Sequence, residues 1–174
     1  MDRGDISNWA EAYDESYDEE LHEIEQTLHE ALQKQRYITQ SQLRNVVTWK
    51  LDNQAGRRSG NIERVNQVPD AFVRRVSEAA LLVDDPKVQL KTLSSIPGIG
   101  YATATVVLTF YDPEQYAVGD RYMVDLFFDD DRQMRVTDYP KLLSELRDRN
   151  PGGFDLRTVE KAYYQRYREE NGIA

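Results

Sequence analysis

Apolar residues recur at intervals of three and four along most of this 174-residue chain, and no segment shows the sustained alternation of a strand. This spacing places apolar side chains on one face of a helix. We therefore predict an all-α fold, with a single helical domain over residues 1–174. Its first element is expected to be one long acidic helix from Ser7 to Gln35, with these apolar positions: Trp9, Tyr13, Tyr17, Leu21, Ile24, Leu28 and Leu32.

Capping residues and prolines mark the helices that follow. Thr39 and Asp70 each precede an apolar-periodic segment, and Pro86 stands at a first helical position. The polar stretch 53–60 predicts a loop. Two final helices are expected within 139–170. We expect two lobes, one holding the central helices and the other joining the N-terminal helix to the last two helices.

The segment from Leu93 to Tyr101 predicts a tight turn between two helices over residues 86–111. Pro97 ends the helix before it, while Gly98 and Gly100 can adopt positive φ and let another backbone approach closely. The helix that begins after Gly100 has unpaired N–H groups in its first turn, and such groups bind anions such as phosphate. The pattern resembles the helix-hairpin-helix motif of DNA-binding proteins, and this resemblance implies a hairpin that holds a DNA backbone. An ordinary helical corner with a glycine cap is the alternative.

The charge of the chain is unevenly distributed. The net charge is −9, yet residues 1–30 alone carry eleven acidic residues and one basic residue. Between Lys34 and Arg75 there are nine basic residues and three acidic ones. These basic residues could contact phosphates, or they could neutralise the acidic helix. The acidic composition, with sixteen Arg against six Lys, is typical of proteins from salt-loving organisms.

Several chemistries are excluded by composition. With no cysteine, the chain can form no disulfide, thiolate zinc site or iron–sulfur cluster. Its two histidines, His22 and His29, lie in the acidic segment and are interpreted as surface residues. There is no apolar run long enough to span a membrane and no signal peptide, so we expect a cytoplasmic location.

A second motif follows the turn at a spacing of twenty residues. The turn and the segment Tyr116-Ala117-Val118-Gly119-Asp120 together resemble the signature of the helix-hairpin-helix DNA glycosylases, the endonuclease III superfamily. The resemblance covers 41–128 and implies a fold of DNA-glycosylase type with duplex DNA as partner. It implies that Asp120 is a catalytic carboxylate, which stabilises a cationic sugar or activates water after the base has been flipped out.

The same resemblance implies a set of binding residues. The hairpin would hold the DNA backbone through Pro97, Gly98, Ile99, Gly100, Tyr101, Ala102 and Thr103. The hairpin carbonyls of Ser94, Ile96 and Ile99 would hold a monovalent cation, K⁺ or Na⁺, and no other cofactor is implied. Phosphate contacts are assigned to Lys50, Arg57, Arg58 and Arg121, with solvated surface charge as the alternative for each.

The chain also departs from the superfamily pattern. Ala102 stands where bifunctional members carry a lysine, which implies a monofunctional enzyme without strand cleavage. Asp120 precedes an apolar run after a glycine, so it is also expected as a helix N-cap, and both roles are compatible. Two other functions stay open: a non-catalytic hairpin module with a protein partner on the acidic helix, and a structural domain without DNA.

A further likeness spans most of the chain. The residues Trp49-Lys50, 116–120 and 167–171 are similar to segments in small uncharacterised prokaryotic relatives of the glycosylases. Trp49 and the tyrosines of the last helix have helical spacing, which favours core packing over base stacking for these side chains: Trp49, Tyr163, Tyr164 and Tyr167.

Overall fold

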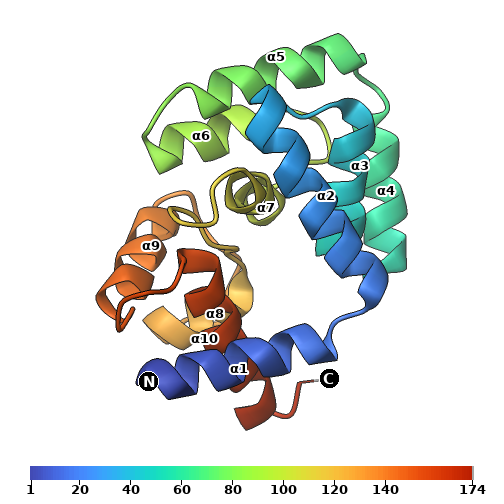
Figure 1. Ribbon diagram of the computed structural model, residues 1–174. Helices are drawn as coiled ribbons and strands as arrows, with labels where there is room; N and C mark the ends of the chain where they lie inside the picture. The colour runs from blue at the N-terminus through green and yellow to red at the C-terminus, as the bar shows by residue number, and fades with distance from the viewer. Residues whose placement is uncertain (174) are drawn as a thin grey trace.

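The computed structural model describes residues 1–173, and within that range it contains ten α-helices and no strand, which confirms the all-α prediction (Figure 1). None of these helices is long and apolar enough to cross a bilayer. The helices are α1 (Arg3–Ser16), α2 (Glu19–Gln35), α3 (Gln40–Lys50), α4 (Ala55–Val65), α5 (Asp70–Leu81), α6 (Pro86–Leu93), α7 (Tyr101–Tyr111), α8 (Arg121–Phe128), α9 (Asp138–Asp148) and α10 (Leu156–Glu170).

The helices form two groups. In one group α7 packs against α2, α3 and α6, and its residues from Thr103 to Phe110 are all buried. In the other group α1 lies along α10, which also contacts α8 and α9 (Figure 1). The expected association of the N-terminus with the last helices is therefore present, but only for α1. The C-terminal helices lie at 138–148 and 156–170, within two residues of their expected bounds.

The prediction of a single helix from Ser7 to Gln35 is wrong, because the segment forms two helices. Tyr17 adopts an extended conformation and ends α1, and the side chain of Asp18 caps α2 by accepting from the Glu20 N–H at 3.2 Å. The apolar spacing continues across this break, so periodicity alone did not reveal it. The break sends α1 to α10 and α2 to α7, and it leaves Tyr17 between the two groups.

The loop expected over 53–60 is also wrong, because most of it belongs to α4. Gly56 and Gly60 have open space where a side chain would stand, and they do not stop the helix. Helical propensity disfavours two glycines, but packing of α4 against α3 outweighs that preference. Arg57 and Arg58 therefore project from a helix rather than from a loop.

The turn between α6 and α7 requires glycine at only one of its two positions. Gly98 has φ +88°, and a Cβ atom placed on it would lie 2.4 Å from the carbonyl oxygen of Asn61 on α4. Gly100 has φ −88° and caps α7, and a Cβ atom placed on it would meet no other part of the protein within 4 Å. Of the two glycines expected to be able to adopt positive φ, only Gly98 therefore does so.

We predict that Gly98→Ala destabilises the protein and that Gly100→Ala does not. A left-handed backbone at alanine costs about 1–3 kcal/mol, and the clash with Asn61 adds to this cost. Loss of a glycine N-cap should cost less than about 1 kcal/mol. Urea unfolding of the two variants measures the difference, and equal stabilities would show that α4 does not hold the turn in this conformation.

Candidate functional site

A cleft of about 980 Å³ lies between the two helix groups. Its walls come from α1, α3, α4, the turn at 98–100, the first residues of α7 and α8, and α10. Asp120 lines this cleft together with the hairpin segment from Gly98 to Thr103. The structure thus brings the turn and the candidate carboxylate, two separate motifs in the sequence, to the same cavity.

Asp120 is the N-cap of α8, as expected. One carboxylate oxygen, Oδ1, accepts from the backbone N–H groups of Tyr122 at 2.9 Å and Met123 at 3.1 Å. The other oxygen, Oδ2, accepts from the Lys50 ammonium at 3.0 Å. Both side chains are only about one-seventh exposed, at 14% for Asp120 and 13% for Lys50. Three donors therefore fix the orientation of this carboxylate beside the cleft.

Asp120 is held in place by the buried segment that precedes it. The Gly119 N–H donates to the Thr105 hydroxyl at 2.9 Å, and the Tyr139 hydroxyl donates to the Ala117 carbonyl at 2.9 Å. A Cβ atom on Gly119 would lie 2.6 Å from the sulfur of Met134. Close packing against Met134 therefore leaves little room for a side chain at the position before Asp120.

The structure separates the residues expected to contact phosphate. Arg57 and Arg121 line the cleft, whereas Arg58 and Pro97 do not. Arg58 instead donates to the Asp52 carbonyl at 3.3 Å. Lys50 lines the cleft, but its ammonium is engaged by Asp120.

Three further arginines, which the sequence analysis did not assign, line the cleft. Arg64 lies seven residues after Arg57 on α4, two helical turns away on the same face, and Arg157 and Arg168 lie on α10. Among the described residues, Arg57, Arg64 and Arg168 have no carboxylate partner, although the chain carries 31 acidic residues. Arg121 pairs with Asp131 at 3.0 Å. The spacing of Arg57 and Arg64 would have been informative had this stretch been recognised as a helix.

Aromatic side chains form a second group in the cleft that the sequence did not predict. The Tyr13 and Tyr17 rings stack with centroids 4.6 Å apart, and Tyr17 lies 5.9 Å from Trp49. The Tyr164 ring meets Tyr13 edge-on at 6.0 Å and Tyr122 at 6.1 Å. Six aromatic residues line the cleft: Tyr13, Tyr17, Trp49, Tyr101, Tyr122 and Tyr164.

The expectation of core packing holds for some of these aromatic residues. Trp49 is 3% exposed and packs edge-on against Phe110, and Tyr163 is buried. Tyr164 is only half-buried and lines the cleft. Its environment raises the pKa of its hydroxyl, mainly through burial and secondarily through the charge of Asp120. Tyr167 donates to the carboxylate of Asp125.

Behind the aromatic rings lies a buried ion cluster centred on Arg157, which is 3% exposed. Its guanidinium donates to both carboxylate oxygens of Glu25 at 3.0 Å, to Glu160 and to the Tyr13 hydroxyl at 3.1 Å. Burial raises the pKa of Glu160, with Arg157 opposing the effect. Burial by itself would raise the pKa of Glu25. The charge and hydrogen bonds of Arg157 lower this pKa by more, so it lies below its usual value.

The three hairpin carbonyls assigned to a monovalent cation differ in their hydrogen bonding. The Ile96 carbonyl accepts from the Ile99 N–H at 3.1 Å. The carbonyls of Ser94 and Ile99 accept no hydrogen bond from any residue in 1–173. Within the same residues there is no cluster of three acidic or histidine side chains suited to a metal ion. The cation therefore stays a prediction that rests on backbone oxygens.

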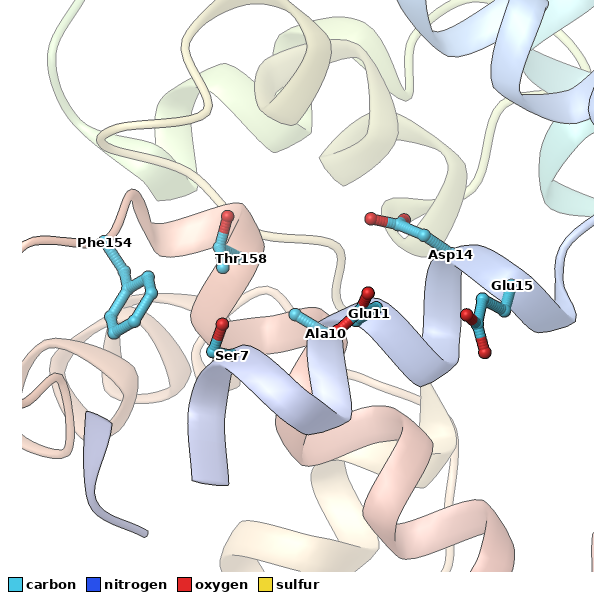
Figure 2. A pocket seen from close by; sticks show the side chains of 7 residues that line it. All are labelled: Ser7, Ala10, Glu11, Asp14, Glu15, Phe154 and Thr158. Atoms are coloured by element: carbon cyan, nitrogen blue, oxygen red, sulfur yellow. The ribbon is translucent and has the colours of Figure 1, made fainter. Parts of the chain in front are cut away.

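A second hollow carries the opposite charge. Figure 2 shows Ser7, Ala10, Glu11, Asp14 and Glu15 along α1, with Phe154 and Thr158 opposite them. Asp14 pairs with Lys161 at 2.8 Å, while Glu11 and Glu15 have no cationic partner among the described residues. Three carboxylates here would repel phosphate, so a polyanion is expected to approach the cleft of Asp120 instead.

Comparisons with models of protein families, with curated proteins and with solved structures give no match to this chain. The chemistry of the cleft therefore has to be argued from its own residues. A fixed carboxylate, a glycine turn with free helix amides, aromatic rings and arginines without carboxylate partners share one cavity.

Proposed function

We propose that this protein binds duplex DNA and hydrolyses the N-glycosidic bond of a nucleotide flipped into the cleft, as a monofunctional DNA glycosylase. One observation carries the proposal: Asp120, oriented by three donors, lines the same cleft as the hairpin backbone from Gly98 to Thr103. Cleavage of this bond develops positive charge on the sugar. A fixed carboxylate beside the sugar stabilises that charge.

The remaining residues of the cleft suit a nucleotide. A flipped base needs apolar faces on which to stack, and the rings of Tyr17, Tyr122 and Tyr164 supply them at the cleft surface. The guanidinium groups of Arg57 and Arg64 can bind backbone phosphates on the side of the hairpin. The first backbone N–H groups of α7 have no partner within the helix, and N–H groups in this position bind phosphate.

Two features support hydrolysis without strand cleavage. Ala102 supplies no amine at the position where bifunctional members carry lysine. Lys50 is the lysine that lines the cleft within residues 1–173, and its ammonium is paired with Asp120. The ion pair holds this nitrogen against the Asp120 carboxylate, and an ammonium has no free electron pair with which to attack the sugar. We therefore assign Lys50 to positioning Asp120.

The acidic hollow on α1 favours one alternative, a hairpin module that holds DNA and recruits a basic protein partner without catalysis. The two functions differ in chemistry. Incubation of the protein with duplexes that each carry one altered base, such as uracil, hypoxanthine or 8-oxoguanine, tests for a released base by chromatography. Release of a base supports the glycosylase, and binding without release across the panel favours the module.

DNA binding itself is expected to depend on the arginines of α4. The wild type should bind a 20-base-pair duplex without sequence preference, with an affinity that falls as salt is added. Replacing Arg57 and Arg64 with Gln should lower the affinity and reduce the slope of log K against log salt by about 0.9 for each phosphate that is no longer neutralised. Fluorescence anisotropy at several salt concentrations measures both quantities.

Arg149→Gln is the matched control for this experiment. Arg149 is paired with Glu145 at 2.9 Å on α9 and does not line the cleft, so its replacement should leave affinity and slope near the wild-type values. Equal effects of the α4 pair and the control would show that overall charge, and not the cleft, governs binding.

A further inference from the structure

A second carboxylate, Glu160 of α10, also lines the cleft. Its Oε2 atom accepts from Arg157 and from the Val118 N–H at 3.4 Å. Its Oε1 atom accepts no hydrogen bond from any residue in 1–173, and it is not among the unpaired polar atoms that are sealed from solvent. Glu160 is thus anchored through one oxygen, while its other oxygen has no hydrogen-bond partner among the described residues.

The charges around Glu160 leave one negative charge in excess. Arg157 is shared between Glu160 and Glu25, Lys161 lies between Asp14 and Glu25, and Lys50 is paired with Asp120. Four carboxylates therefore face three cations, in a region where Glu160 is 2% exposed. The surplus is relieved when one carboxyl group carries a proton.

The proton is best placed on Glu160. Burial is the main cause that raises the pKa of this carboxyl; Arg157 and Lys50 lower it, and the charge of Asp120 raises it further. Glu25 has a lowered pKa because Arg157 donates to both of its oxygens. The Tyr13 hydroxyl, which also contacts Arg157, accepts a hydrogen bond from its guanidinium.

We propose that Glu160 is the general acid of the cleft and protonates the departing base while Asp120 stabilises the sugar. This inference rests on the proposed N-glycosidic hydrolysis. Two carboxyl groups in one site, one that donates a proton and one that stabilises the cationic sugar, are the arrangement that divides these roles in glycoside hydrolysis.

The proposed step balances without a further reactant. The C1′–N bond breaks, and its electron pair goes to the base nitrogen. The proton of Glu160 is transferred to the base, which leaves neutral. A water oxygen attaches to C1′, and the proton that this water loses passes through the Asp120 carboxylate to solvent. Glu160 then takes up a proton from solvent and is restored.

The need for an acid defines a substrate class. A neutral base leaves as an anion unless it is protonated, so its departure depends on a proton donor. A base that already carries a positive charge, such as 7-methylguanine, leaves neutral without one. We therefore expect the substrates to be neutral altered bases, with cationic alkylated bases insensitive to Glu160.

Glu160→Gln separates these cases. The variant keeps an oxygen acceptor for Arg157 and Val118 but has no acidic proton. Release of a neutral base should fall by about 10²–10⁴-fold, the usual contribution of general acid catalysis. Release of 7-methylguanine should be unchanged. Glu169→Gln, an exposed glutamate of the same helix outside the cleft, should match the wild type on both duplexes.

The pH dependence gives a second readout. Because the acid form is active and the pKa of Glu160 is raised, wild-type release of a neutral base should fall as pH rises through that pKa. Glu160→Gln should lack this decline. A ¹³C NMR titration of glutamate side chains should show one carboxyl titrating above about 4.3, the ordinary value, and lose that signal in the variant.

The outcomes distinguish this inference from the function on which it rests. If no duplex in the panel loses a base, both are overturned. If release requires Asp120 but Glu160→Gln behaves as Glu169→Gln does, only the role of Glu160 is overturned. An ordinary or lowered pKa for Glu160 in the titration also overturns it, and thermal unfolding verifies that the variant is folded.

Discussion

Asp120→Asn is expected to reduce base release by at least about 10²–10³-fold, the loss seen when one preorganised charge-stabilising group is removed, while duplex affinity stays equal or rises. An amide cannot supply the negative charge that stabilises a cationic sugar. It does remove the repulsion between a carboxylate and the DNA phosphates. Chromatography of released base and fluorescence anisotropy on the same duplex measure the two effects.

Asp120→Asn also alters the contact with Lys50, and a double variant controls for this change. The oxygen of the introduced asparagine can still accept from the N–H groups of Tyr122 and Met123, but its amide nitrogen would then face the Lys50 ammonium. The double variant Lys50→Met with Asp120→Asn removes that conflict. If the double variant regains wild-type release, Asp120 acts only as a helix cap. Asp120→Ala should in addition cost about 1 kcal/mol of stability, because alanine cannot cap the helix.

Arg157→Met is expected to destabilise the protein by about 3–5 kcal/mol at pH 7, the cost of leaving a buried charge without its partner. The substitution leaves Glu25 and Glu160 without the guanidinium that both share. Methionine has no donor to replace it. Urea unfolding at pH 7 measures the loss, and a loss below about 1 kcal/mol would show that water reaches the cluster.

The loss should shrink in acid. Burial acts to raise the pKa of both carboxyls, and without Arg157 only the smaller effects of Lys50 on Glu160 and of Lys161 and His22 on Glu25 oppose it. Each group then has a folded pKa above its unfolded value, so the folded state is favoured at low pH and loses stability as pH rises. Unfolding at pH 4.5 and pH 7 tests the sign. Replacing Glu25 and Glu160 with Gln in the Arg157→Met background should restore stability at pH 7.

The sequence correctly predicted the helix starts that depend on a few neighbouring residues. Thr39 and Asp120 accept from N–H groups two or three residues ahead, so their roles as caps are visible within four residues of sequence. Pro86 begins α6 for an equally local reason. Two features were not predicted from such signals. The apolar spacing continues across Asp18, so the break between α1 and α2 was missed. Helix α4 forms although it contains two glycines, because its packing outweighs their low helix propensity.

The order of residues along the chain was enough to predict that it is helical, that a turn with a left-handed glycine joins α6 to α7, and that Asp120 begins a helix. What Asp120 faces became visible only once the helices were packed together. Lys50 is seventy residues away in sequence, and Arg157 joins helices more than 130 residues apart. Hydrogen bonds within a helix cap are fixed by neighbouring residues, whereas ion pairs between distant helices depend on how those helices pack.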